Sequence, residues 1–405
     1  MTTDLQFNPD DLAFIRDPHP HLRALREQSP IFDWQARQVL VFSRHEHVRQ
    51  LMADSRLSNS VLEWQFHQPA ELEGDHFRAL RRIQSSALFT LPDADHGRVR
   101  RLAAAAFTPR AVERQRATVQ AVVDRVLAEL TSEGQTEINV RDYAERIPVA
   151  VISDLVGVPE QHRPDFLAFA RAGIELTQPF MPRHRLVGIA EVFTRAEQVL
   201  LELFAEAREH QRDDLLGDLV RAQDQGEQLS EDELLALMSG LLTAGSDTTV
   251  HALCFAIRAL LGAPEQLAEI RADRSLLRNA LDETLRWDFF GKLGTFRFAR
   301  ETFEFEGWTI PKGKLCIMNQ PAALRDPEAF ADPDRLDIHR ELGHAISFGL
   351  GRHYCMGASL ARLELELAFT TLLLDRYPNA KLVGEPEFEQ NLLMRPMAKL
   401  MLALA

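Results

Sequence analysis

Apolar residues recur at helical spacing along most of the chain, and strand-like patterns are short and few. The spacing predicts helices over residues 10–29, 44–54, 110–130, 141–156, 159–178, 183–211, 230–261, 275–287 and 356–374. Short apolar or alternating runs predict strands at 39–43, 296–307 and 392–396. The pattern therefore predicts a mainly α-helical fold with a smaller β region.

The predicted helix 230–261 has poor helix formers at its centre. Its start carries a capping box, in which Ser230 caps the first turn and Glu233 reaches back. At ~1.5 Å per residue it is roughly 45 Å long, which is enough to cross the molecule. Its centre, 244–249, reads Ala-Gly-Ser-Asp-Thr-Thr, and the last five of these residues weaken a helix interior. Such a break in propensity indicates either an ordinary kink or a functional site.

A loop with two internal glycines, residues 348–357, places one cysteine at the start of a predicted helix. It reads Phe-Gly-Leu-Gly-Arg-His-Tyr-Cys-Met-Gly. Gly349 and Gly351 allow the backbone to turn sharply and to approach a flat ligand. Backbone N–H groups at a helix start favour negative charge, so Cys355 is predicted to be biased toward the thiolate, which binds metal. The alternative is that Cys355 is a small buried hydrophobe.

The pattern Phe-x-x-Gly-x-His-x-Cys-x-Gly, which ends at Gly357, resembles the haem-binding signature of the cytochrome P-450 superfamily. The resemblance implies that haem b is the cofactor and that Cys355 is the axial thiolate ligand of its iron, which favours O–O cleavage. It also implies that His353 binds a haem propionate and that Phe348 packs beneath the macrocycle. The implied fold is the triangular, helix-rich P-450 prism (α+β), with haem between the helix that contains Thr248 and the helix that follows Cys355.

A predicted helix upstream and a predicted strand downstream match further superfamily motifs. His96 and Arg100 lie four residues apart and share one helix face. Taken alone, this spacing is also typical of a solvated face. The resemblance implies that both hold haem propionates, together with Arg297 from the strand.

The centre of helix 230–261 and the helix 275–287 also match the superfamily. The resemblance implies that Asp247 and Thr248 form the catalytic acid–threonine pair, which delivers protons to dioxygen. It implies a structural ion pair between two residues three apart, Glu283 and Arg286. The residues of the central helix expected to contact the haem are Ala244 and Gly245.

Residues 288–294 depart from the superfamily, which usually has a proline here. The resemblance implies that this stretch passes beside the haem, and its phenylalanines indicate an apolar or aromatic substrate. Lys292 could pair with a substrate carboxylate or be solvated. The strand-like run 392–396 would line the far side of the pocket. The candidate pocket residues are Phe289, Phe290, Lys292, Leu293 and Met394.

Two connecting segments would roof the substrate pocket. The loop 58–91 has weak periodicity and scattered aromatic residues, including Trp64, Phe66 and Phe89. The connection 178–185 carries Phe180 and Met181 and would act as a lid. These apolar side chains could equally pack their own segments down.

Composition narrows the class of protein further. The 405 residues are 45% apolar and 26% charged, which is typical of a globular protein, and a net charge of −14 argues against nucleic acid as a partner. The three cysteines form no CxxC pair, so neither a zinc site nor a disulfide framework is predicted. Without a signal peptide or an apolar run of about eighteen residues, we expect a cytoplasmic protein without a membrane anchor. We expect one domain, 1–405, with its β-rich part at roughly 1–60, 288–340 and 380–405.

The resemblance implies a monooxygenase that inserts one oxygen atom from dioxygen into a C–H or C=C bond. The substrate would be a small to medium, largely apolar compound of bacterial secondary metabolism or catabolism. No electron-transfer domain follows the haem domain, so a separate ferredoxin and reductase are expected to donate electrons to a monomer. A peroxide-driven enzyme and a non-catalytic haem-binding sensor are the alternatives. The expected ferredoxin-docking residues are Arg98, Arg101, Arg110 and Arg114.

Overall fold

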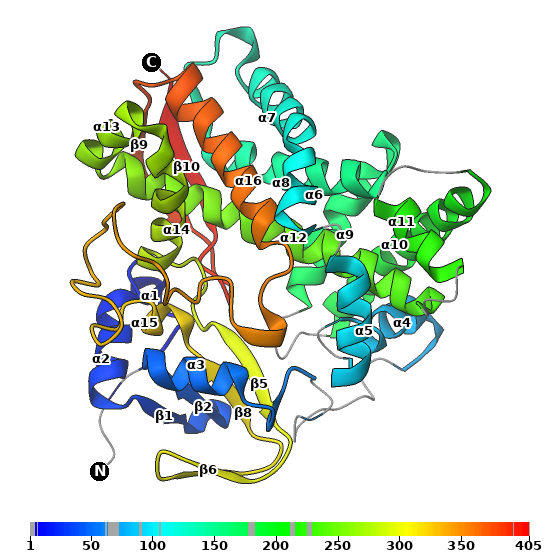
Figure 1. The fold of residues 1–405 in the computed structure, drawn as a ribbon, viewed down its shortest axis with the longest axis horizontal. Helices are drawn as coiled ribbons and strands as arrows, with labels where there is room; N and C mark the ends of the chain where they lie inside the picture. The colour runs from blue at the N-terminus through cyan, green and yellow to red at the C-terminus, as the bar shows by residue number, and fades with distance from the viewer. Residues whose placement is uncertain are drawn as a thin grey trace.

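Helices fill most of the molecule, and its largest sheet lies at the bottom in Figure 1, close to the N-terminus. The computed structural model describes residues 5, 7–60, 63, 73–88, 91–104, 107–176, 183–210, 215–224, 229–391 and 393–404. The helices are α1 (Leu12–Arg16), α2 (His19–Gln28), α3 (His45–Ala53), α4 (Arg78–Ser85), α5 (Asp93–Ala104), α6 (Pro109–Arg114), α7 (Arg116–Leu130), α8 (Val140–Val156), α9 (Arg163–Glu175), α10 (Arg183–Glu209), α11 (Leu215–Asp224), α12 (Glu231–Leu261), α13 (Pro264–Ala272), α14 (Leu277–Trp287), α15 (Gln320–Ala323) and α16 (Ala358–Phe369).

Strands come from both ends of the chain and from the region after α14. They are β1 (Ile31–Trp34), β2 (Val39–Phe42), β3 (Leu57–Ser58), β4 (Glu137–Asn139), β5 (Thr295–Ala299), β6 (Phe303–Phe305), β7 (Trp308–Ile310), β8 (Leu315–Met318), β9 (Lys381–Phe388) and β10 (Met397–Ala403). In the described part of the chain, the largest sheet has the order β1-β2-β8-β5-β3. Its β2–β8 pair is parallel, with Val39 opposite Leu315, and the other pairs are antiparallel. This order fixes Arg297 on β5, between β8 and β3.

The long helix α12 runs through the middle of the molecule (Figure 1) and organises the helical part. The predicted capping box is confirmed: the Glu233 N–H donates to the Ser230 hydroxyl at 3.1 Å, and the Ser230 N–H donates to the Glu233 carboxylate at 2.9 Å. The helices α4, α8, α9, α14 and α16 pack on α12, and its apolar side chains join theirs in the main core. Much of the helical part therefore packs around α12.

Several local predictions need correction. The segment 10–29 forms two helices instead of one, because Asp17 precedes a proline and adopts an extended conformation with φ −142°. The run 392–396 is not a strand in its described residues, where Met394 makes an isolated bridge to Gly291. Strand β4 lies outside the expected β-rich ranges and pairs with β10. The helix after the cysteine ends in a π-helical turn at Thr370–Arg376.

The expected roof of the pocket is only partly described. Phe180 and Met181, and the aromatic residues Trp64, Phe66 and Phe89, lie outside the described residues. The segment 58–91 contains a helix that the sequence pattern missed, α4, whose Leu80 and Ile83 are buried. In the part of the chain described, no helix has the length and apolarity needed to cross a lipid bilayer.

Candidate active site

The cysteine loop is a tight turn that presents Cys355 at its surface. The Cys355 N–H donates to the Phe348 carbonyl at 2.8 Å, which closes the loop. Gly349 and Gly351 have φ values of 76° and 67°, a region that side chains disfavour. A Cβ added at Gly351 or Gly357 would meet only open space. The thiol is exposed although the loop lies between other elements, as a ligand of a bound group requires.

The expected thiolate bias of Cys355 is not seen in the free thiol. Although the side chain reaches the surface, the protein atoms packed around the thiol desolvate it and raise the pKa of Cys355 above its ordinary value, and the N–H of Gly357 and the charges of Arg100 and Arg362 only partly oppose this. Arg362 also covers Phe348, with its guanidinium 4.3 Å from the ring centroid. The local charges thus favour a thiolate, but without a metal they do not outweigh burial.

Four basic side chains from three elements gather beside this loop. We call His96, Arg100, Arg297 and His353 the cation cluster. The rings of His96 and His353 are 4.5 Å apart, and Arg100 donates to the carbonyl of Tyr354. Helix α5, strand β5 and the cysteine loop therefore bring together the residues that the resemblance assigned to propionates.

Within the described part of the chain, the charges that most affect Arg297 and His353 are those of other basic residues. Burial and the charge of Arg352 lower the pKa of Arg297 to about 10. Burial, followed by the charges of Arg297, His96, Arg352 and Arg100, lowers the pKa of His353 to about 3. Burial and the neighbouring positive charges disfavour the charged forms of these side chains, and an anion bound among them would favour those forms. Two carboxylates, such as those of haem, fit this cluster.

The centre of α12 presents an open stripe instead of a packed face. Leu241, Ala244, Gly245 and Thr248 follow helical spacing and are exposed or partly exposed, whereas the flanking turns are buried. A Cβ added at Gly245 would meet nothing. The Thr248 hydroxyl donates to the Ala244 carbonyl at 2.8 Å. The open stripe and the exposed Cys355 provide the two surfaces that a flat group between α12 and the loop before α16 needs.

Asp247 turns away from the open stripe toward α8. Its carboxylate lies 3.1 Å from His251 Nε2 and 3.6 Å from a guanidinium nitrogen of Arg141. Burial raises the pKa of Asp247, but the hydrogen bond from His251 and the charges of His251, Arg141 and Arg171 outweigh it, so the pKa lies below its ordinary value. Sequence reasoning missed His251, although its i,i+4 spacing from Asp247 was visible.

The pair Glu283–Arg286 is buried and fully bonded. Two guanidinium nitrogens donate to the Glu283 carboxylate at 2.7 and 2.8 Å. Arg286 also donates to the carbonyls of Leu324, Pro333 and Arg335, in the segment that leads to the cysteine loop. The pair therefore anchors that segment on α14.

Backbone hydrogen bonds to residues 393–395 fix the path of residues 288–294. The Lys292 N–H donates to the Leu393 carbonyl at 2.7 Å, and the Arg395 N–H donates to the Phe290 carbonyl at 2.8 Å. At Gly294, with φ 89°, a Cβ would collide with the Met318 carbonyl. This pairing and this glycine take the place of the proline usual in the superfamily.

Two of the five candidate pocket residues, Lys292 and Leu293, face the N-terminal segment. Lys292 is neither solvated nor free to pair with a substrate carboxylate, so both expectations for it are wrong. The Lys292 side chain is 0% exposed, its ammonium donates to the Pro9 carbonyl at 2.8 Å, and it lies 3.6 Å from Asp10. Burial, opposed by Asp10, lowers the pKa of Lys292 to about 8. Leu293 packs in a core cluster with Phe7.

Of the other candidate pocket residues, Phe290 lies near α12, whereas Phe289 is buried in a core cluster with residues of the largest sheet. Phe289 and Phe290 stack with ring centroids 4.8 Å apart, and Phe290 lies 6.1 Å from the ring of His251. Met394 is partly buried opposite Gly291. Phe290 therefore connects this segment to the Asp247 side of α12.

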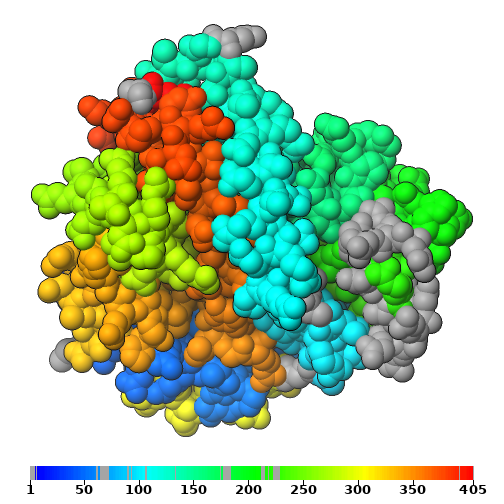
Figure 2. Space-filling model, turned by 45° about the horizontal axis from the view of Figure 1, so that its top comes forward, coloured from blue at the N-terminus to red at the C-terminus, as the bar shows by residue number. Residues whose placement is uncertain are grey.

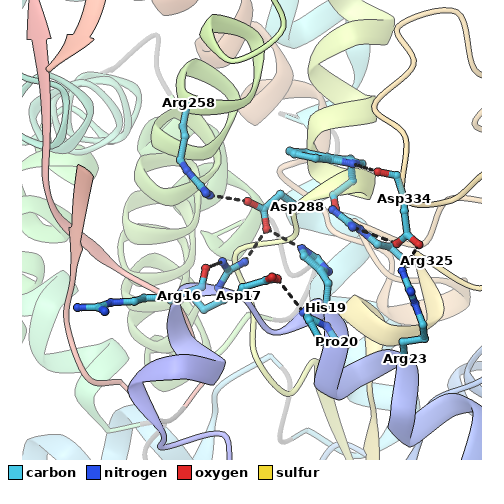
Figure 3. A pocket seen from close by; sticks show the side chains of 11 residues that line it. Arg16, Asp17, His19, Pro20, Arg23, Arg258, Asp288, Arg325 and Asp334 are labelled. Carbon is cyan, nitrogen blue, oxygen red and sulfur yellow. Dashed lines mark hydrogen bonds and ion pairs between the residues drawn. The ribbon is translucent and has the colours of Figure 1, made fainter. Parts of the chain in front are cut away.

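A charged cavity of about 410 Å³ lies beside the start of α2 and the end of α14, apart from the cation cluster. Figure 3 shows His19 and Arg258 converging on Asp288, while the guanidinium of Arg16 points away. Asp288 also binds Arg395 at 2.6 Å. Asp288 therefore links α2, α12 and the segment that contains Arg395 beside this cavity.

The comparisons agree with this geometry. The family profile described as Cytochrome P450 matches residues 37–397. Epothilone C/D epoxidase of Sorangium cellulosum is 37% identical over 94% of this chain and 91% of its own length. Cytochrome P450 monooxygenase PikC of Streptomyces venezuelae is 32% identical over 92% and 87%.

Solved structures show the same relationship. The crystal structure of epothilone D-bound cytochrome P450epoK superposes with a TM-score of 0.92 at 35% identity, covering 98% of this chain and 99% of that one. The predicted mainly α P-450 fold is thereby confirmed. The chain belongs to the cytochrome P450 family of haem-thiolate monooxygenases, and its cofactor is haem b.

Proposed function

We propose that this chain oxidises an apolar, polyketide-type compound by inserting one oxygen atom from dioxygen into a C–H or C=C bond. The observation that carries the proposal is the combination of an exposed Cys355, a cluster of basic side chains whose charges disfavour one another at Arg297 and His353, and an open stripe on α12. Cys355 would bind the haem iron, and the cation cluster would bind the propionates. Haem supplies the activation of dioxygen, and the protein supplies ligand, orientation and protons.

Asp247 and Thr248 are proposed to transfer protons to the open side of α12. The Thr248 hydroxyl donates to the Ala244 carbonyl, so its oxygen lone pairs stay available to accept a hydrogen bond in the stripe. Asp247 is next along the chain, and its carboxylate, which His251 and Arg141 favour in the ionised form, would accept protons and pass them to Thr248. The apolar stripe at Leu241 and Ala244 would keep water away from the reacting bond.

The proposed substrate class rests on the stripe and on the relatives. The residues that face the open side of α12 are mostly apolar, and Phe290 extends this character. One relative is named an epothilone C/D epoxidase, and another, of Bacillus subtilis, is named a polyketide biosynthesis cytochrome P450. Secondary metabolism is therefore the first context in which to seek a substrate.

A separate ferredoxin is the proposed electron donor, and the chain is proposed to act as one domain and as a monomer. Helices α5, α6 and α7 (cyan) lie beside the segment that leads into α16 (orange) on the face in Figure 2. Arg101, Arg110 and Arg114 are exposed there and have no ion pair with a described residue. Arg98 drops out of the expected docking set, because it is bonded to Glu233 and Asp95.

Turnover under three electron supplies tests the proposal. Purified holoenzyme is incubated with epothilone-type macrolides and a ferredoxin with its reductase, with peroxide alone, or with neither. We expect a product heavier by one oxygen atom, labelled from ¹⁸O₂, only with the ferredoxin system. Product with peroxide alone would support a peroxygenase. Binding of macrolides without product under any supply would contradict monooxygenation of this substrate class.

A further inference from the structure

The environment of Asp247 contains a histidine that the family motif does not supply. His251 lies one turn after Asp247 on α12 and is 1% exposed. Its Nε2 is 3.1 Å from the Asp247 carboxylate, and its Nδ1 is 3.4 Å from a guanidinium nitrogen of Arg141 on α8. Arg141 also lies 3.6 Å from the carboxylate, so the three side chains close a triangle.

Arg141 determines which nitrogen of His251 carries the proton. A guanidinium is always protonated and can only donate, so the Nδ1 that faces it must accept. The proton of a neutral His251 therefore sits on Nε2, which donates to Asp247. A doubly protonated ring would direct an N–H toward the guanidinium, which the geometry disfavours.

The triangle cannot carry protons inward from the protein surface through His251. Such a relay would require Arg141 to release a proton to Nδ1, and its guanidinium does not do so in proteins. We propose that His251 is a positioning residue, which holds the Asp247 carboxylate in one orientation as a hydrogen-bond acceptor. This inference rests on the proposed function, in which Asp247 supplies protons beside Thr248.

Charges from neighbouring helices act on the same carboxylate. Arg141 and Glu145 come from α8, where they lie 3.8 Å apart, and Arg171 from α9 binds Glu145 at 2.6 Å. Phe290 covers the His251 ring at 6.1 Å and brings no charge. Removing the His251 donor would leave a carboxylate whose burial raises its pKa and whose orientation only Arg141 restrains.

Two substitutions of His251 separate hydrogen bonding from packing. His251→Phe keeps a ring but has no donor, whereas His251→Gln keeps an N–H that can reach a carboxylate one turn away. In the substrate-bound holoenzyme we expect His251→Phe to lower product formed per dioxygen consumed about tenfold. We also expect this ratio to fall further from pH 8 to about pH 5, because a carboxyl that stays protonated can no longer accept the next proton for Thr248. His251→Gln and the wild type should keep a high ratio that changes little with pH.

A second readout does not depend on turnover. His251→Phe should lower the thermal midpoint of the holoenzyme more in the wild-type background than in an Asp247→Ala background, because alanine has no acceptor for the His251 N–H. Arg141→Met should shift the pH dependence in the same direction as His251→Phe, and it serves if His251→Phe does not fold.

The outcomes distinguish this inference from the proposed function. Asp247→Asn with unchanged coupling would overturn the role of Asp247 and with it this inference. Impaired Asp247→Asn together with a wild-type pH profile in His251→Phe and Arg141→Met would overturn the positioning role alone. Equal losses in His251→Gln and His251→Phe would also overturn it, because packing would then explain both.

Discussion

Two groups of buried, ionisable side chains in the described part of the chain differ in the sign of the charges that act on them. Around the end of α14, Glu283 binds Arg286, and Asp288 binds Arg395, with the donor and acceptor atoms 2.6–2.8 Å apart. We call these four residues the α14 junction. In the cation cluster, by contrast, the charges that act on Arg297 and His353 are all positive. Paired charges hold segments together, whereas unbalanced charges mark the place of a charged ligand.

The largest effect is expected from removing a carboxylate of the α14 junction. Asp288→Asn leaves the buried Arg395 without its anion, so the free energy of unfolding should fall by about 3–5 kcal/mol. Urea denaturation of the holoenzyme measures this loss. The matched control is Asp375→Asn, whose pair with Arg274 is exposed and should cost about 0–1 kcal/mol. Equal losses in the two variants would remove the distinction between junction and surface.

The second-largest effect is expected in the cation cluster. Arg297→Gln removes a cation that the fold does not balance, so stability should change less than in Asp288→Asn. Haem binding should weaken by about 1.5–3 kcal/mol, since a charged hydrogen bond to a propionate is lost. The rate of haem transfer to apomyoglobin measures this, with the exposed Arg101→Gln as control. An unchanged rate of haem loss in Arg297→Gln would contradict the role of Arg297 in binding a haem propionate.

Acid should abolish the contribution of Asp288 to stability. Burial raises the pKa of Asp288, but Arg395, His19 and Arg258 together hold it well below its ordinary value of 3.8. A depressed pKa in the folded state stabilises the fold above pH 3.8, and this contribution decreases by about 1.4 kcal/mol per unit as the pH falls further. The difference in unfolding free energy between wild type and Asp288→Asn should therefore shrink below that pH. A constant difference would contradict the pKa shift.

The smallest expected effect tests a contact outside both charged groups. Ser230→Ala removes the cap of α12 and should cost about 1 kcal/mol in unfolding free energy. The absorption spectrum of the holoenzyme should not change, because Ser230 is exposed at the end of the helix. A spectral change would show that the start of α12 influences the haem site.

Most of the fold follows from local pattern. The apolar spacing of α12 and its capping box predicted the helix and its start within one residue, because both signals depend on neighbours in sequence. The break at Asp17 was also readable, since a proline restricts the residue before it. Strand β4 was missed because three residues carry little pattern and pair with β10, far along the chain.

The candidate site was predictable where residue type fixes chemistry and not where tertiary contacts do. Cys355, the cation cluster and the Asp247–Thr248 pair came from motif and spacing, and the structure brings Cys355 and the cluster together. The burial of Lys292 depends on a contact with Pro9, 283 residues away, which no local pattern reports. The ion pair between Arg98 and Glu233 also joins residues that are far apart in the sequence, so no local pattern predicted it.

The central claim is that Cys355 binds the iron of a haem whose propionates the cation cluster neutralises. The most direct measurement is the absorption spectrum of the reduced carbon monoxide complex, for the wild type and for Cys355→Ser purified with haem. We predict the thiolate-type Soret band in the wild type and its complete loss in Cys355→Ser. The same thiolate band in both proteins would contradict the account.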